Sequence, residues 1–146
     1  MTLKNKVLVV LATGFILCGI QPLQVKGGES LNSNYESFTE LVSEFQNLTE
    51  VQQERWNIKN KWKYRVAGKG TVSEVEDTDI FSAIQGNYYE VTVELEDNNR
   101  AVIYYPKTKK YDWVADLQKD SRLSFKGRLK SIKDWGMWVS GYIKGE

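Results

Sequence analysis

The sequence has 146 residues, a length that suits one domain with a modest hydrophobic core. It holds no histidine and a single cysteine, and its 20 basic and 19 acidic residues leave it close to neutral. This composition argues against catalysis by a cysteine–histidine pair and against zinc sites built from those residues. The balanced charge argues against a general nucleic-acid binder, which relies on an excess of basic residues.

Residues 1–27 are predicted to be an export signal. Lys4 and Lys6 precede an uncharged, mostly apolar run over residues 7–20, VLVVLATGFILCGI. A charged start and an apolar run of this length are typical of a signal peptide, whereas a transmembrane helix needs about 20 apolar residues. Cleavage after Gly27 fits the small residues there, and we expect a periplasmic or secreted protein.

Cys18 allows a second interpretation, a lipid anchor on the membrane. Leu17 before it is not the small residue that a lipobox requires, so membrane attachment is expected only if Cys18 is lipidated. Cleavage after Gly27 would remove Cys18 and three lysines, leaving 17 basic and 19 acidic residues and no thiol.

Helical spacing follows a short polar leader at residues 28–34. Residues 35–60 are predicted to form two helices that pack on the rest of the chain. The first has an apolar stripe of Phe38, Leu41, Val42, Phe45 and Leu48. The second opens with the capping-box pattern of Thr49 and Gln52 and ends near Asn60.

From Trp62 onward the period changes from 3.6 to 2, which predicts strands. We expect a first strand through Val72, a polar loop over residues 76–87, and a second strand over residues 88–96. The Asp-Asn-Asn turn at 97–99 leads into a third strand that Pro106 ends. Residues 109–119 have a helical pattern, and two more strands run through residues 123–132 and 138–143.

This order predicts a mainly β domain over residues 61–146: a five-stranded OB-fold, which is a Greek-key barrel with a helix between strands 3 and 4. The stretches YRVAGKGTVSEVED and SRLSFKGRLKSIKD share a spacing, so that Gly70 matches Gly127 at a shift of 57. After each glycine the alternation slips. We interpret this as a bend followed by a bulge in strands 1 and 4; an internal duplication is the alternative.

The runs YRVAGKGTVSEV, YYEVTVEL with RAVIYY, DWVADLQKDSRLSFKGRL and WGMWVSGYI resemble the tRNA_anti-like OB-fold proteins. The resemblance covers about residues 49–145. That family consists of small bacterial exported proteins and lipoproteins, often described as candidate nucleic-acid binders. It therefore implies an OB-fold, export and a polymer ligand such as single-stranded nucleic acid or an oligosaccharide, and it carries no catalytic signature.

OB-folds bind ligands across strands 2 and 3 and between the neighbouring loops, here residues 73–87 and 133–137. Exposed aromatic side chains would stack on bases or sugars, and basic ones would meet phosphates. The candidate binding residues are Tyr88, Arg100, Tyr104, Lys126, Arg128 and Trp135. A core position is the alternative for the aromatic members, and a core position is expected for Tyr89, Tyr105 and Trp138.

Acidic residues argue against phosphate on that face. Strand 2 turns Glu90, Glu94 and Glu96 outward, and the loop before it reads EVEDTD. This loop is interpreted as a solvated acidic segment rather than a calcium site, because the glycine and closing glutamate of an EF-hand are missing. Acids gather in residues 28–98 and bases in residues 99–146, so the halves either form a polar surface or mix in space.

No pair of carboxylates and no phosphate-binding glycine loop marks an active site. We expect a non-catalytic binding protein with no metal and no cofactor. Its ligand is a polymer, single-stranded nucleic acid or an oligosaccharide. The alternative is an envelope protein–protein module that binds no nucleic acid.

Overall fold

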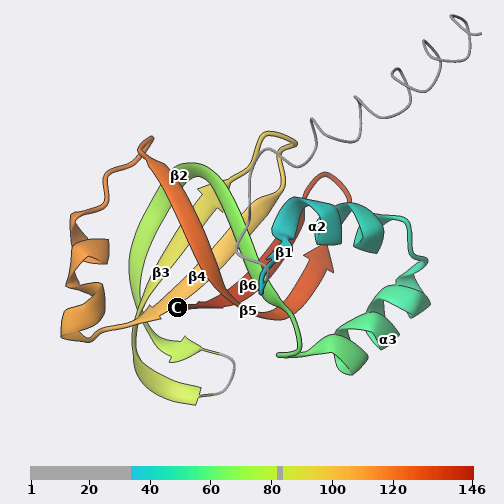
Figure 1. The fold of residues 1–146 in the computed structure, drawn as a ribbon, viewed down its shortest axis with the longest axis horizontal. Helices are drawn as coiled ribbons and strands as arrows, with labels where there is room; N and C mark the ends of the chain where they lie inside the picture. The colour runs from blue at the N-terminus through green and yellow to red at the C-terminus, as the bar shows by residue number, and fades with distance from the viewer. Residues whose placement is uncertain (1–33, 82–83) are drawn as a thin grey trace, which may run out of the picture. The chain divides into compact units, whose positions relative to one another are not determined.

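Six strands and three helices make up the described part of the chain, residues 34–81 and 84–146, in this computed structural model (Figure 1). The predicted signal peptide, with Cys18, and most of the predicted leader lie outside these residues. Among the described residues no helix is long and apolar enough to cross a membrane.

The strands pair in a ring. They are β1 (Glu36–Ser37), β2 (Arg65–Phe81), β3 (Ile84–Glu94), β4 (Arg100–Pro106), β5 (Arg122–Asp134) and β6 (Val139–Gly145). Starting from β2, the order of neighbours is β3, β4, β6 and β5, and β5 pairs with β2 again. Every contact in the ring is antiparallel except that between β4 and β6, and the short β1 runs parallel to β2.

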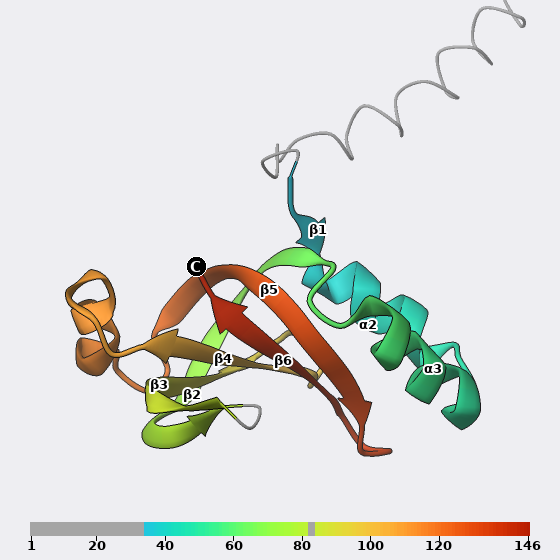
Figure 2. The ribbon, with the colours of Figure 1, turned by 90° about the horizontal axis from the view of Figure 1, so that it is seen from below.

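The two long strands, β2 and β5, each pair with two neighbouring strands along different parts of their length. The first part of β2, up to Thr71, pairs with β5, and the remainder pairs with β3. Figure 2 shows the strong curvature that this division imposes on both strands. Bulges occur at Ser73 in β2 and at Lys130 in β5, three residues after Gly70 and Gly127. The predicted bend and bulge in the two related stretches are therefore confirmed.

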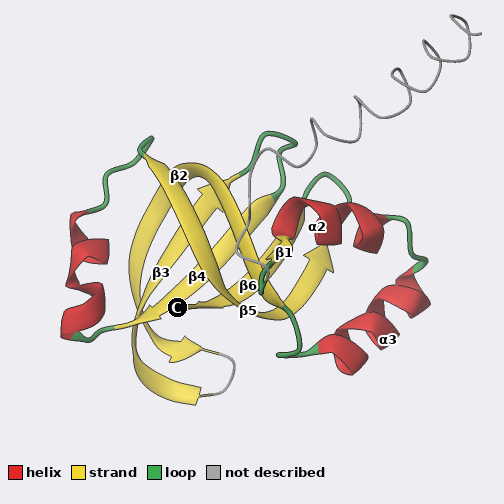
Figure 3. Ribbon diagram, in the orientation of Figure 1, coloured by secondary structure: helices red, strands yellow, loops and turns green. Residues whose placement is uncertain are grey.

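Two helices, α2 (Phe38–Gln46) and α3 (Glu50–Asn60), follow β1 (Figure 3). They contribute differently to the core. Helix α2 buries four residues of the predicted stripe, Phe38, Leu41, Val42 and Phe45, among strand residues. Each such side chain stabilises the fold by about 1.5–3 kcal/mol. The fifth, Leu48, follows the helix and packs partly buried against the same core. Helix α3 buries no residue fully, although Trp56 stacks on Tyr64 with ring centroids 5.7 Å apart.

Polar contacts stabilise helix α3 at its start and connect its last turn to β5. At its start the Thr49 backbone N–H donates to Gln52 Oε1 at 2.9 Å, as the predicted capping box requires. Further along, the Asn57 side chain donates to the Ile132 carbonyl at 2.7 Å and accepts from the Ile132 N–H at 2.8 Å. The Asn57 amide thus makes the pair of backbone hydrogen bonds that a neighbouring strand would make, two residues after the bulge in β5.

The structure differs from the prediction in three elements. The prediction of a polar loop over residues 76–87 is wrong, because β2 continues to Phe81 and β3 already begins at Ile84. Residues 109–119 contain a shorter 3₁₀ helix, η1 (Lys109–Asp116), which buries Tyr111 and Val114. The short strand β1 was not predicted, because two residues carry no detectable alternation.

Candidate functional site

A second apolar cluster lies on the side of β3, β4 and β6 that faces away from the main core. Val102 and Tyr104 of β4 are its buried members, and the residues packed on them are Trp62, Tyr88 and Tyr142. We call these five residues the aromatic face. Strand alternation explains its position: Val91, Val93 and Ile103 point into the core, so their neighbours in the chain point outward.

Burial inside the aromatic face changes the properties of its hydroxyls. Only 8% of Tyr104 is exposed. Burial is the main cause that raises the pKa of Tyr104 well above its usual range, and the nearby Glu90 carboxylate, which also hydrogen-bonds with it, adds to the rise. Burial likewise raises the pKa of Tyr142. Both side chains are neutral hydroxyls at physiological pH, and that of Tyr104 is held by its contact with Glu90.

The turn between β5 and β6 extends the aromatic face. Trp135 is 48% exposed and hydrogen-bonds with the Tyr142 side chain. Lys133 Nζ lies 3.8 Å from the centre of the Trp135 ring, a cation–π contact. Met137 follows in the same turn and is 82% exposed. An amphipathic ring held beside a charge, at a surface turn, is well placed to stack on a ligand.

Acids border the aromatic face on one side. Glu74, Glu76 and Glu90 project from paired positions of β2 and β3, and we call them the acidic ridge. The charge of Glu74 is the main cause that raises the pKa of Glu76, with a smaller contribution from Glu90. Within the described residues, no group of three or more carboxylate, cysteine or histidine ligands could hold a metal ion.

Bases border the aromatic face on the other side. An open pocket of about 470 Å³ lies where β2, β5, β6 and η1 meet. We call it the basic pocket, and its charged lining consists of Arg65, Lys110, Lys126, Arg128, Lys144 and Glu146. Tyr35 also lines it, with its ring 4.4 Å below the Arg65 guanidinium.

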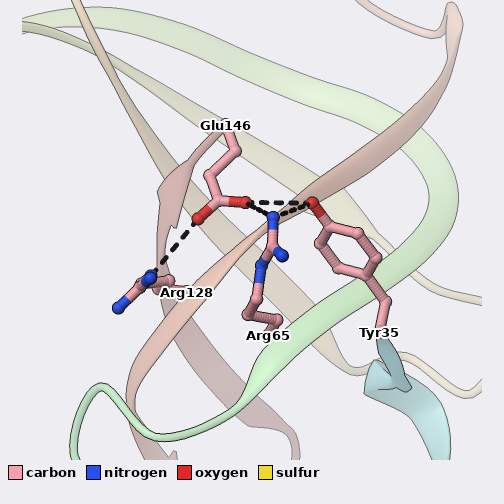
Figure 4. A network of polar contacts seen from close by, with 4 residues as sticks. All are labelled: Tyr35, Arg65, Arg128 and Glu146. Atoms are coloured by element: carbon pink, nitrogen blue, oxygen red, sulfur yellow. Dashed lines mark hydrogen bonds and ion pairs between the residues drawn. The ribbon is translucent and has the colours of Figure 1, made fainter. Parts of the chain in front are cut away.

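Glu146 connects several members of the basic pocket (Figure 4). Its carboxylate accepts from Arg65 Nη2 at 2.7 Å, from the Tyr35 hydroxyl at 3.0 Å and from Arg128 Nε at 3.4 Å. The hydrogen bond from Arg65 is the main cause that lowers the pKa of Glu146. The carboxylate is therefore charged at neutral pH and offsets one positive charge.

One row of register partners joins all three surfaces. Across the sheet from β2 it reads Glu76, Glu90, Tyr104, Lys144, Arg128 and Arg65. Paired residues project from the same face of a sheet, so the charge changes from acidic to basic across Tyr104. The acidic and basic halves of the sequence are thus partly segregated in space, with Arg65 and Lys69 of β2 added to the basic side.

The structure divides the six predicted site residues among separate places. Tyr88 and Tyr104 lie in the aromatic face and Trp135 on its edge, whereas Lys126 and Arg128 line the basic pocket. Arg100 is at the far end of β4, paired with Glu94 at 3.6 Å and lying over the Trp138 ring at 4.9 Å. Tyr105 lies in the main core and Tyr89 packs against it, but Trp138 is outside the core cluster, contrary to expectation.

Sequence reasoning did not select Trp62, Tyr142, Arg65, Lys110 or Lys144. Tyr142 and Lys144 occur at alternating positions of the last strand, so the outward period of β6 carried a usable signal. Arg65 and Lys110 join the pocket only through the pairing of β2 with β5 and the return of η1, which no local pattern reveals.

No protein-family model matches the chain, and no characterised protein sequence matches it. The chain resembles the solved structure of a candidate nucleic acid-binding lipoprotein from Klebsiella pneumoniae subsp. pneumoniae. The TM-score is 0.50 at 14% sequence identity, and the match covers 79% of this chain and 93% of that one. At this identity the likeness shows a shared fold.

Proposed function

We propose that the chain is an exported, non-catalytic OB-fold protein that binds single-stranded nucleic acid across the aromatic face. The ring of strand pairs, with η1 between β4 and β5, supports the OB-fold. The apolar N-terminal run supports export, and lipidation of Cys18 would add a membrane anchor.

The observation that carries the proposal is the row in which Tyr104 adjoins Lys144 and Arg128. Binding of a single strand combines aromatic surfaces, on which bases stack, with positive charge that follows the backbone. The exposed Trp135 and the partly exposed Tyr88 and Tyr142, which surround the buried Tyr104, supply the first. The basic side of the row supplies the second. The name of the Klebsiella lipoprotein agrees with this ligand class.

An oligosaccharide would use the same aromatic face without needing the basic residues. Salt dependence separates the two ligands, because phosphate contacts weaken steeply with salt whereas sugar stacking does not.

The test is titration of the purified chain with a fluorescent single-stranded oligonucleotide at two salt concentrations. We expect binding that weakens steeply with salt and is lost or reduced about 10-fold in Trp135→Ala, given a stacking contribution of about 1–3 kcal/mol. Trp113→Ala is the matched control, because Trp113 is 44% exposed but neither belongs to the aromatic face nor lines the basic pocket. Absence of binding at low salt would contradict the proposal.

The acidic ridge favours a second candidate, a basic protein partner in the cell envelope. Glu74 and Glu90 lie close enough to raise the pKa of Glu76. These three carboxylates would repel phosphates by on the order of 1 kcal/mol for each near pair. They would attract lysine and arginine side chains of a partner. Loss of partner binding in Glu74→Gln/Glu76→Gln, with no oligonucleotide binding in the wild type, would select this candidate.

A further inference from the structure

The basic pocket holds more positive charge than its own residues neutralise. Among the described residues, five cationic side chains line it, and Glu146 is the one acidic side chain that does. The cations come from four elements: β2 gives Arg65, η1 gives Lys110, β5 gives Lys126 and Arg128, and β6 gives Lys144. Folding therefore brings together charges that are far apart in the chain.

Strand register places some of these charges directly opposite one another. Arg128 is the partner of Arg65 on one side and of Lys144 on the other. Like charges at paired positions of a sheet destabilise it. Binding of an anion between these cations would relieve their repulsion.

Glu146 forms ion pairs with two of the cations but offsets only one positive charge, and three cations lie outside these ion pairs. Its carboxylate pairs with Arg65 and Arg128. Within the described part of the chain, Lys110, Lys126 and Lys144 form no ion pair with a carboxylate. Lys126 and Lys110 instead lie over the rings of Tyr35 and Tyr111, at 5.7 Å and 4.7 Å. In the same part of the chain the buried Nε of Arg65 has no hydrogen-bond partner, so a donor is also left over.

We propose that the basic pocket is a binding site for a multiply charged phosphate group, and that Glu146 is an internal counter-ion which this group displaces. The proposal goes beyond nucleic-acid stacking on the aromatic face and does not depend on it. The planar guanidinium of arginine donates two parallel hydrogen bonds to phosphate oxygens, and the lysine ammonium contributes a compact positive charge. A terminal phosphomonoester or a diphosphate suits a pocket with a side-chain excess of four positive charges better than one backbone phosphodiester does.

Displacement of Glu146 requires only a side-chain movement. Its backbone N–H donates to the Lys126 carbonyl at 3.1 Å, which fixes the main chain. The carboxylate lies between Arg128 and Arg65 (Figure 4), and it would turn toward solvent when a stronger anion takes its donors.

Calorimetric titration of the purified chain with inorganic pyrophosphate at low salt tests the site. We expect Lys126→Ala/Lys144→Ala to bind about 10-fold more weakly, since two charge contacts that together contribute about 1.4 kcal/mol are lost. Lys59→Ala/Lys63→Ala makes the same charge change at exposed positions outside the pocket, and should change affinity less than about 2-fold. Equal losses in both pairs, or no pyrophosphate binding by the wild type, would overturn the proposal.

Glu146→Gln tests the counter-ion separately. We expect it to bind pyrophosphate several-fold more tightly, because the competing negative charge is gone; sulfate should respond in the same direction. Unchanged or weaker binding in a variant that stays folded by circular dichroism would overturn the role of Glu146.

Two further titrations identify where the phosphate comes from. Preference for a 5′-phosphorylated oligonucleotide over the same strand with a 5′-hydroxyl would assign the pocket to a strand end. Preference for phosphatidic acid vesicles over phosphatidylcholine vesicles would assign it to a lipid head group. Either result supports the site, and no preference in both comparisons contradicts recognition of a terminal phosphate. Pyrophosphate binding without oligonucleotide binding would overturn only the proposed function.

Discussion

Gly70 and Gly127 occupy matching environments on the two strands that curve most. A side chain at Gly70 would meet the carbonyl oxygen of Glu94 in β3, and one at Gly127 would meet that of Lys144 in β6. In each case a β-branched side chain of the same neighbouring strand, Val93 or Ile143, lies 2.7 Å from the position of the missing Cβ. Glycine is needed at both places because a neighbouring backbone approaches closely.

Gly127→Ala should therefore destabilise the protein by about 3 kcal/mol, because overpacking against a backbone carbonyl cannot be relieved by a side-chain rotation. Gly70→Ala should have a similar effect. Urea unfolding measures both, with Ser124→Ala on the exposed side of β5 as a control that changes stability little. A loss below about 0.5 kcal/mol in either glycine variant would mean that the strands separate easily there.

The repeated glycine could be predicted from sequence because its cause is local: one residue type and a slip in alternation mark the place where a strand leaves one neighbour for the next. The strand at residues 76–81 was missed for an equally physical reason. Glu76, Asp77 and Asp79 are typical of turns, yet a two-stranded extension tolerates them because all three side chains are exposed there.

The candidate site was harder to predict, since its parts meet only through strand register. Tyr88 and Tyr104 could be selected from alternation alone. Lys126 and Arg128 were selected too, but they belong with Arg65 and Lys144, on the opposite border of the aromatic face from the acidic ridge. Pairing between β2 and β5 decides this, and it joins residues more than 50 positions apart in the chain.

Asn57→Ala should lower the free energy of unfolding by about 1–3 kcal/mol. Both the N–H and the C=O of Ile132 would lose their partner at a part-buried position. Asn47→Ala is the matched control, because the Asn47 side chain donates only to the Ser43 carbonyl at an exposed site. Equal effects of the two variants in chemical denaturation would contradict a special role for Asn57.

Trp62 has a positive φ of 64°, in the left-handed region that bulky side chains rarely adopt. Its packing in the aromatic face offsets this cost, which is about 1–2 kcal/mol. Both Trp62→Ala and Trp62→Gly remove the packing, but only glycine removes the strain as well. Trp62→Gly should therefore be about 1 kcal/mol more stable than Trp62→Ala in thermal or urea unfolding, the reverse of what is expected for an ordinary position. An alanine variant as stable as the glycine variant would mean that the backbone relaxes once the ring is gone.

Glu146 should make stability depend on pH in the acid range. The hydrogen bond from Arg65, with those from Tyr35 and Arg128, keeps the pKa of Glu146 below the ordinary value of 4.5. Because the folded state holds this proton less tightly than the unfolded state, the carboxylate stabilises the fold fully above that value. Its contribution is lost as the pH falls from 4.5 through the lower pKa of the folded state.

Urea unfolding of the wild type and Glu146→Gln across this range measures the contribution as a difference. The wild type should be more stable at neutral pH, and the gap should narrow as the solution is acidified below 4.5. Glu54→Gln, an exposed carboxylate of α3, serves as a control for removal of one charge outside the pocket. A gap that stays constant on acidification would mean that Glu146 stabilises the pocket through hydrogen bonds that need no charge. Saturating pyrophosphate should close the gap even at neutral pH if the phosphate replaces the carboxylate among the same donors, which ties the acid response of the fold to occupancy of the pocket.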